Sequence, residues 1–320
     1  MSTVEKFGQM LIAVAIFAAL FGLIMFIVDR VKGRQADRIA ALAFIGPAIL
    51  LLVWGLLRPA ILTIVRSFKD AAGDKWVGFE NYSTMFTNSD QLIVLRNTFI
   101  WVLLVPFVAS AIGLLYALLV DRTRTEALAK ALVFLPMAIS MVGASIIWKF
   151  VYAYRPGESG QIGLVNQLLV WMGLDSFQFL LSRPWNNLFL IVVMIWIQAG
   201  FAMTILSAAI KAIPDDIVEA ARLDGVKTLG MFRFVTLPSI RPALIVVLTT
   251  IAIATLKVFD IVRTMTGGNF GTSVVANEFY TQAFRANDRG LGAALAVLLF
   301  ILVIPIVVYN VIQLRKADVR

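Results

Sequence analysis

The side chains with the clearest chemical potential are polar groups set inside long apolar stretches of the chain. Gln198 lies in the middle of one stretch, three residues before Phe201. Residues three apart share a face of a helix, so an amide and an aromatic ring would stand side by side. That pair suits a sugar, because the amide bonds hydroxyl groups and the ring covers the apolar C–H face. The alternative is helix packing, in which the glutamine bonds a neighbouring helix.

A later apolar stretch is interrupted by five polar side chains, namely Thr249, Thr250, Thr255, Lys257 and Asp260. An unpaired charge at membrane depth is costly. Lys257 and Asp260 are three residues apart, so a helix would bring them together. We therefore expect these two to pair with each other rather than to contact a ligand.

The residue types that serve most reaction chemistry are missing. The chain has no histidine and no cysteine, which excludes thiolate metal sites, Ser-His nucleophiles and the zinc-protease motifs. No clustered carboxylates appear, so a membrane-embedded enzyme is disfavoured. Nothing matches the phosphate-binding loop G-x-x-x-x-G-K-[ST], and any ATP that drives this chain must bind another polypeptide. The glycine-rich run 266–271 is interpreted as a turn.

Composition and apolar blocks predict an all-α membrane protein. Of 320 residues, 60% are hydrophobic and 15% are charged, against about 45–50% and about 25% in soluble domains. A membrane-spanning helix needs about 20 mostly apolar residues. Seven stretches qualify, at about 7–28, 40–65, 97–120, 128–153, 187–210, 242–264 and 291–314. Residues 162–181 contain too many polar breaks and predict an interfacial or loop segment.

The distribution of basic residues predicts the orientation. Four regions, at 30–38, 122–130, 211–241 and 315–320, hold more than half of the 28 lysines and arginines. Cytoplasmic loops collect these residues, so the N-terminus is expected outside and the C-terminus in the cytoplasm. The net charge of +9 is explained in the same way, and no stacking-rich basic domain indicates nucleic-acid binding. We expect the aromatic belt to include Trp101, Trp148, Trp185 and Trp196.

The segment 211–241 between the fifth and sixth stretches is too polar to span a membrane. Pro214 and the two aspartates after it predict a helix start. Gly225 predicts its end, because glycine readily adopts the left-handed cap. A second short helix is expected to about Phe234, ending before Pro238. By spacing alone this is a helix-turn-helix on the cytoplasmic face, or an interfacial loop that only anchors two spans.

The motif in this segment resembles the EAA loop of permease subunits of binding-protein-dependent ABC importers. It comprises Glu219-Ala220-Ala221, Asp224-Gly225 and Leu237-Pro238, with Val226 where alanine is usual. In that family the loop docks into a cleft on the ATPase and transmits its closure to the spans. The resemblance implies coupling roles for Glu219, Ala220, Ala221, Asp224 and Gly225.

The resemblance covers nearly the whole chain after the first span and is nearest to maltose, trehalose and alpha-glucoside permeases of the F type. The motifs that carry it are Asn97-Thr98, Phe134-Leu135-Pro136 and Thr266-Gly267-Gly268; Asn269-Phe270 departs from the usual glycine and proline. It implies a six-helix type I importer core over 39–320 and one extra N-terminal helix with a basic loop over 1–38.

Counting from the conserved landmarks of that family implies which positions contact the sugar. They are Ile197, Gln198, Phe201, Thr250 (or Ile251, one residue on), Ala254, Thr255 and Val258. The asparagines of the maltose permease are not reproduced, so the particular sugar stays open.

The resemblance also implies the partners. They are a dimer of ABC ATPases that holds ATP and Mg²⁺, a second permease, an extracytoplasmic solute-binding protein, the sugar and the lipid bilayer. No cofactor and no catalytic residue is expected in this chain. A secondary transporter driven by an ion gradient is the first alternative, but Asp260 is its one plausible intramembrane carboxylate and no repeat is evident. An importer of the same family for a phosphorylated polyol or a peptide is the other.

Overall fold

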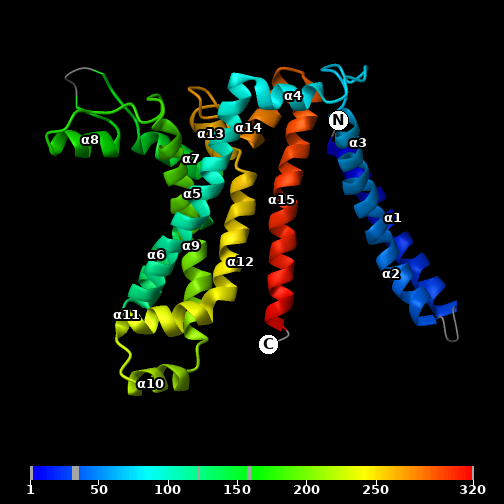
Figure 1. The fold of residues 1–320 in the computed structure, drawn as a ribbon. Coiled ribbons are helices and arrows are strands. Elements are labelled where there is room, and N and C mark those ends of the chain that lie inside the picture. The colour runs from blue at the N-terminus through cyan, green and yellow to red at the C-terminus, as the bar shows by residue number, and fades with distance from the viewer. Residues whose placement is uncertain (1–2, 31–35, 122, 157–159, 319–320) are drawn as a thin grey trace. The chain divides into compact units, whose positions relative to one another are not determined.

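The computed structural model describes residues 3–30, 36–121, 123–156 and 160–318, which are helical nearly throughout (Figure 1). These residues contain no strand, only an isolated bridge between Lys69 and Trp76. Helices are expected because the hydrocarbon core of a membrane leaves the backbone no partner except itself. Six helices are long and apolar enough to cross a membrane, or seven with one bent pair. The chain divides into two compact units, residues 1–65 and 66–320.

The first unit is a pair of apolar helices. Helix α1 spans Thr3–Arg30, and helix α2, Ala36–Leu52, continues through the π-turn Val53–Leu57 into α3, Arg58–Arg66. Their apolar side chains are almost all exposed, as expected where lipid is the partner. The predicted basic loop lies partly outside the described residues, as do Arg122 and the last two residues of the C-terminal basic region.

The core of the second unit lies between three long helices. Helix α5, Ser89–Val120, packs against α9, Asn186–Lys211, and both pack against α12, Leu237–Leu256. Helix α15, Arg289–Asp318, packs on the other side of α12. The buried side chains at the centre are large and apolar, among them Leu190, Met194 and Ile251. This arrangement brings the C-terminal end of α5 near the C-terminal end of α9.

Glycine permits the closest of these approaches. A Cβ atom on Gly113 of α5 would lie 2.6 Å from the Cβ of Ala202 and 2.6 Å from the backbone nitrogen of Met203 on α9. Small residues allow backbones to approach in membranes, where the hydrophobic effect does not hold helices together. The α5–α9 contact therefore depends on the absence of a side chain at position 113.

Short helices cap one end of the second unit. Helices α4 (Glu80–Thr87), α8 (Leu164–Trp171), α13 (Asp260–Met265) and α14 (Val275–Tyr280) all lie at the end opposite helix α10, Asp215–Leu223 (Figure 1). The segment 162–181 holds only the short helix α8 and is not a span, as predicted.

The fourth apolar stretch is not one continuous helix, contrary to the prediction for 128–153. Helix α6, Glu126–Phe134, runs into a 3-10 turn, Leu135–Ala138, and the chain bends by 102° into α7, Met141–Val151. Pro136 supplies no N–H donor to a continuing helix. Ser140 then caps α7 by accepting a hydrogen bond from the Gly143 amide at 3.0 Å.

The sixth stretch lies nearer the N-terminus than predicted. Helix α11, Thr228–Met231, continues through the π-turn Phe232–Thr236 into α12, so the chain is helical from 228 to 256 and does not stop before Pro238. The amide of Leu237 bonds the carbonyl of Phe232, five residues back. This wider turn accommodates the proline that follows it.

Two expectations about polar and aromatic groups were also wrong. Helix α12 ends at Leu256, so Lys257 is exposed in a break and forms no ion pair with Asp260, which begins α13. Trp101 is fully buried instead of lying in the aromatic belt, and its indole donates to the Asn187 side chain at 2.8 Å. Trp148 and Trp196 pack edge to face at 5.6 Å.

The α5–α9 contact is testable at Gly113. Gly113→Ala adds one methyl group where backbone atoms already lie, and we expect it to destabilise the protein by about 1–3 kcal/mol. The melting temperature of the purified chain in detergent measures the effect. Gly46→Ala is the matched control, because nothing lies within 4 Å of the added atom. Equal melting temperatures for the two variants would contradict the close approach.

Candidate functional site

Helix α10 is a short, well-capped helix. It follows Pro214, has Asp215 and Asp216 in its first turn and ends at Leu223, as predicted. The amide of Gly225 bonds the carbonyl of Arg222, and the amide of Val226 bonds that of Ala221, both at 3.0 Å. This is a Schellman cap, and it requires the left-handed conformation that Gly225 adopts at φ 78°.

The surface of this helix is open. Glu219, Ala220, Asp224 and Gly225 are exposed and Ala221 is partly covered. Figure 1 shows α10 beyond the ends of the long helices, attached by a linker on each side. Large apolar side chains on it and just after it are also exposed, with Leu223 at 88% and Leu229 at 79%. Ile217 on the same helix is 48% exposed, so three large apolar side chains of this segment have no cover within the chain.

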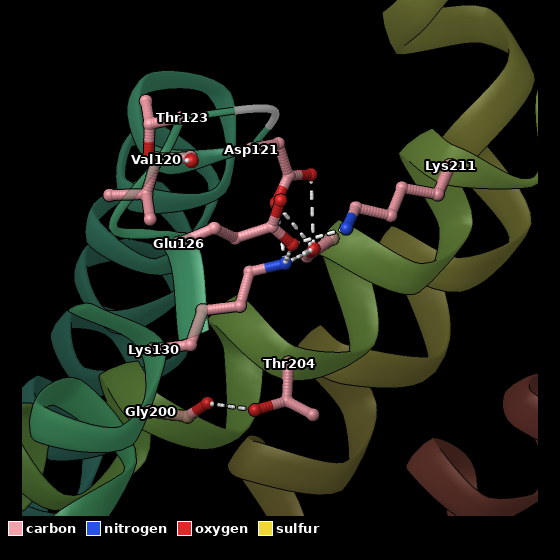
Figure 2. A network of polar contacts seen from close by, with 9 residues as sticks. Val120, Asp121, Thr123, Glu126, Lys130, Gly200, Thr204 and Lys211 are labelled. Atoms are coloured by element: carbon pink, nitrogen blue, oxygen red, sulfur yellow. Dashed lines mark hydrogen bonds and ion pairs between the residues drawn. The ribbon is translucent and has the colours of Figure 1, made fainter. Parts of the chain in front are cut away.

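A network of charged groups lies where α9 ends and the linker to α10 begins (Figure 2). The Lys130 Nζ lies 2.5 Å from the Asp121 Oδ1 and 2.8 Å from the Glu126 Oε1. The Ser207 hydroxyl donates to the Asp121 Oδ1 at 2.7 Å and also contacts Lys130. Lys211 pairs with Glu126.

These five residues join three helices. Asp121 follows α5, Glu126 and Lys130 are one turn apart on α6, and Ser207 and Lys211 are one turn apart on α9. Lys211 is the last residue of α9, three positions before Pro214. The network therefore braces the point from which α10 extends. This network was not among the sites predicted from the sequence, although Glu126 and Lys130 have the i,i+4 spacing of a helical ion pair.

The predicted sugar contacts on α9 are divided between core and surface. Ile197 is 4% exposed and belongs to the main core, while Phe201 is half-buried against it. Gln198 is half-buried, and its amide has no hydrogen-bond partner among the described residues. Gln198 and Phe201 lie on the same helix face, as predicted. Among the described residues no neighbouring helix bonds this amide, whereas the packing alternative would require such a bond.

The predicted contacts on α12 and in the break that follows it are likewise divided. Thr255 and Val258 are buried, and the Thr255 hydroxyl donates to the Ile251 carbonyl one turn back at 2.7 Å. Ala254 is half-buried against the core and Thr250 is exposed. Helices α9 and α12 pack together, so the structure brings Ile197, Phe201, Ala254 and Val258 into one apolar cluster. Thr250 lies outside it.

Comparisons with known proteins agree with this arrangement of spans and helical loop. Residues 93–316 match the family model of the binding-protein-dependent transport system inner membrane component. One relative is the osmoprotective compounds uptake permease protein GgtC of Synechocystis sp. The two chains are 46% identical over 275 residues, which cover 86% of this chain and 99% of GgtC. It is 43% identical to the alpha-glucoside transport system permease protein AglF of Rhizobium meliloti, over 87% of this chain and 83% of that one.

A solved structure shares the fold. It is a bacterial ABC transporter involved in the import of the acidic polysaccharide alginate, with a TM-score of 0.71 and 25% identity over 85% of this chain and 94% of that one. The chain belongs to the family of binding-protein-dependent inner-membrane transport components. It is a multi-pass inner-membrane permease of an ABC importer of the sugar-transport type. No comparison supports the alternative of an ion-gradient transporter.

The charged network at the C-terminal end of α9 is expected to stabilise the fold. The Asp121 side chain is 8% exposed, so Lys130→Ala leaves a nearly buried carboxylate without its cation. Breaking such a pair from one side costs about 3–5 kcal/mol. We expect Lys130→Ala to lower the melting temperature more than the double variant Lys130→Ala/Asp121→Asn does. Strictly additive effects of the two single changes would show that the pair is not coupled.

Proposed function

We propose that this chain lines one half of the path of an ATP-driven sugar importer and that α10 is its coupling helix. The family match supports the role of the whole chain, and the exposed, capped α10 with its leucines is the observation that carries the role of the helix. In this proposal the chain makes and breaks no bond. A separate dimer of ATPases holds ATP and Mg²⁺ and hydrolyses the nucleotide.

The proposed contact is with a cleft on the ATPase. Glu219 and Ala220 are exposed and Ala221 is partly covered, so this turn of α10 offers one charged and two small side chains, while Asp224 and Gly225 form the tight turn that follows. Small side chains let the two backbones approach closely. Leu223 at 88% and Ile217 at 48% exposure would be covered by the partner.

The mechanism that we propose is alternating access. Closure of the ATPases displaces α10, and the displacement reaches α9 through Lys211 and the linker after it. The ion pairs to Glu126 and Asp121 carry it to α6 and α5, so the three helices move together. On the other side of α10, the displacement reaches α12 through the π-turn. Nucleotide hydrolysis then resets the spans toward the inside.

This mechanism places α10 and the C-terminus in the cytoplasm and the N-terminus outside. The basic residues around α10 support it, since lysine and arginine collect in cytoplasmic loops. The end that carries α4, α8, α13 and α14 then faces outward, toward the solute-binding protein. A relative of known structure was solved with a pentasaccharide-bound periplasmic protein, which supports this arrangement. A second permease would complete the path.

The substrate that we propose is an alpha-glucoside or another di- or oligosaccharide. The relatives named for alpha-glucoside and for trehalose/maltose transport support this class. Gln198 and Phe201 offer an amide and a ring, and in the proposal Thr250 and Ala254 of the adjacent α12 add to the same wall of the path. Ile197, Thr255 and Val258 are buried here and would become accessible only when α9 and α12 separate.

The coupling role predicts a loss of transport without a loss of folding. Glu219→Lys reverses the charge on the exposed face of α10, and we expect sugar uptake to fall by roughly tenfold or more because the partner surface no longer matches. The assay is uptake of labelled disaccharide by cells that express all subunits. The control is Arg124→Glu, an equal charge change at an exposed position on the neighbouring loop. Undiminished uptake by the Glu219 variant would remove α10 from the coupling path.

The sugar contact predicts a change in apparent affinity. Gln198→Ala removes an amide that bonds no protein group, and we expect the KM for uptake to rise by about three- to tenfold, the equivalent of one hydrogen bond. Thr204→Ala is the control on the same helix, because its hydroxyl is already bonded to the Gly200 carbonyl at 2.9 Å. An unchanged KM with normal expression would move the site elsewhere.

A further inference from the structure

A cavity of about 290 Å³ opens at the outer end of the second unit, between α5, the start of α9 and the glycine-rich turn. Two arginines line it, Arg96 from α5 and Arg183 from the segment before α9. Both are exposed, and neither has an acidic partner among the described residues. None of the residues that line the cavity is acidic. Two unpaired guanidinium groups in one cavity favour an anionic ligand.

Buried asparagines hold the walls of this cavity in place. The Asn97 side chain donates to the carbonyls of Gly271 and Ser273, at 2.7 and 3.0 Å, and so ties the turn to α5. The Asn186 side chain donates to the Phe270 carbonyl at 3.0 Å and ties the same turn to α9. The cavity is therefore built from fixed backbone rather than from loose side chains.

One buried side chain presents an unused donor to the cavity. Asn187 lines it and is 6% exposed. Its oxygen accepts the Trp101 indole, but its amide nitrogen has no acceptor among the described residues. Gly271 leaves the room for the nearby arginine, since a Cβ there would lie 3.2 Å from the Arg183 Nε. The donors of the cavity are thus two guanidinium groups and one amide.

Exposed apolar side chains form a track along α5 on the face that carries Arg96. Arg96 shares one face of α5 with Ile100, Leu103 and Phe107, at helical spacing, and Leu103 and Phe107 are 48% and 59% exposed. On α9, Leu188 and Val192 are one helical turn apart, and both are exposed. The donors stand where the apolar stretches of both helices begin, which is the level of lipid headgroups. A soluble partner or a free ion would not use the apolar track.

We propose that this cavity binds the phosphate group of a membrane phospholipid, whose acyl chains lie along the exposed faces of α5 and α9. Arg96, Arg183 and the Asn187 amide bond the phosphate oxygens. The bound lipid holds the start of α9 against α5 and the glycine-rich turn. This site is separate from α10 and from the predicted sugar contacts, and it does not depend on which solute is carried.

The test is lipid retention by the purified full-length chain, measured by native mass spectrometry during titration with phosphatidylglycerol. We expect Arg96→Gln/Arg183→Gln to weaken binding by about tenfold or more, since it removes the charge-assisted hydrogen bonds. Lys149→Gln, an exposed cation that does not line the cavity, should bind as the wild type does. A galactolipid with the same acyl chains but no phosphate should bind the wild type as weakly as phosphatidylglycerol binds the double variant.

A second variant keeps the proposal testable if the double variant is poorly folded. Asn187→Asp retains the oxygen that accepts from Trp101 and places a carboxylate against the arginines, so it should also weaken phosphatidylglycerol binding. Equal lipid retention by wild type and variants would overturn the proposal. Displacement of the lipid by millimolar inorganic phosphate would show a free-anion site instead. Variants that keep the lipid but lose uptake stimulated by the solute-binding protein would assign the cavity to protein docking.

Discussion

Helices α5 and α9 lie so close at Gly113 that one added methyl group would meet the Ala202 side chain and the backbone of α9. This contact sits between two polar joints. At the end near the glycine-rich turn, Trp101 bonds Asn187, and at the end near α10 Asp121 bonds Ser207 and Lys130. Each joint is buried or nearly so, where an unmade hydrogen bond is expensive. The two helices are consequently joined by hydrogen bonds near both ends and by close backbone packing in the middle.

In the proposed mechanism, this pair of helices lets the small surface helix α10 act on the membrane path. Helix α10 shares little surface with the rest of the chain, so a partner that grips it would move it easily on its own. The charge network prevents this at the side of α9, because Lys211 pairs with Glu126, which also pairs with Lys130 in the same network. On the other side, the helix that leads to α12 contains a π-turn, a local widening that often marks a site of movement. One attachment is stiff and the other is adaptable.

The polar groups near the glycine-rich turn hold loop backbone in place rather than joining two helices. Asn97 and Asn186 use their side chains to hold backbone carbonyls of the glycine-rich turn, a job that sheet or helix bonds would otherwise do. Gly268 and Gly271 adopt positive φ in this turn, which side chains seldom tolerate. The turn therefore closes over α5 and α9 and leaves the cavity that Arg96 and Arg183 line.

Much of the architecture is determined by the sequence alone. Runs of about 20 apolar residues leave the backbone no choice but helix, so the long helices and the polar helix α10 with its Gly225 cap follow from local chemistry. The local sequence did not determine whether a proline ends a helix, bends it or is accommodated within it. Pro136 bends the fourth stretch, whereas Pro238 follows a π-turn and does not stop its helix, and the same residue type gives both results. Only the tertiary structure decided that Lys257 leaves the helix before Asp260, that Trp101 is buried, and that Asp121 meets Lys130 and Ser207. Those outcomes depend on which helix ends pack together, and residues as distant along the chain as Asp121 and Ser207 carry no signal of their contact in their own neighbourhoods.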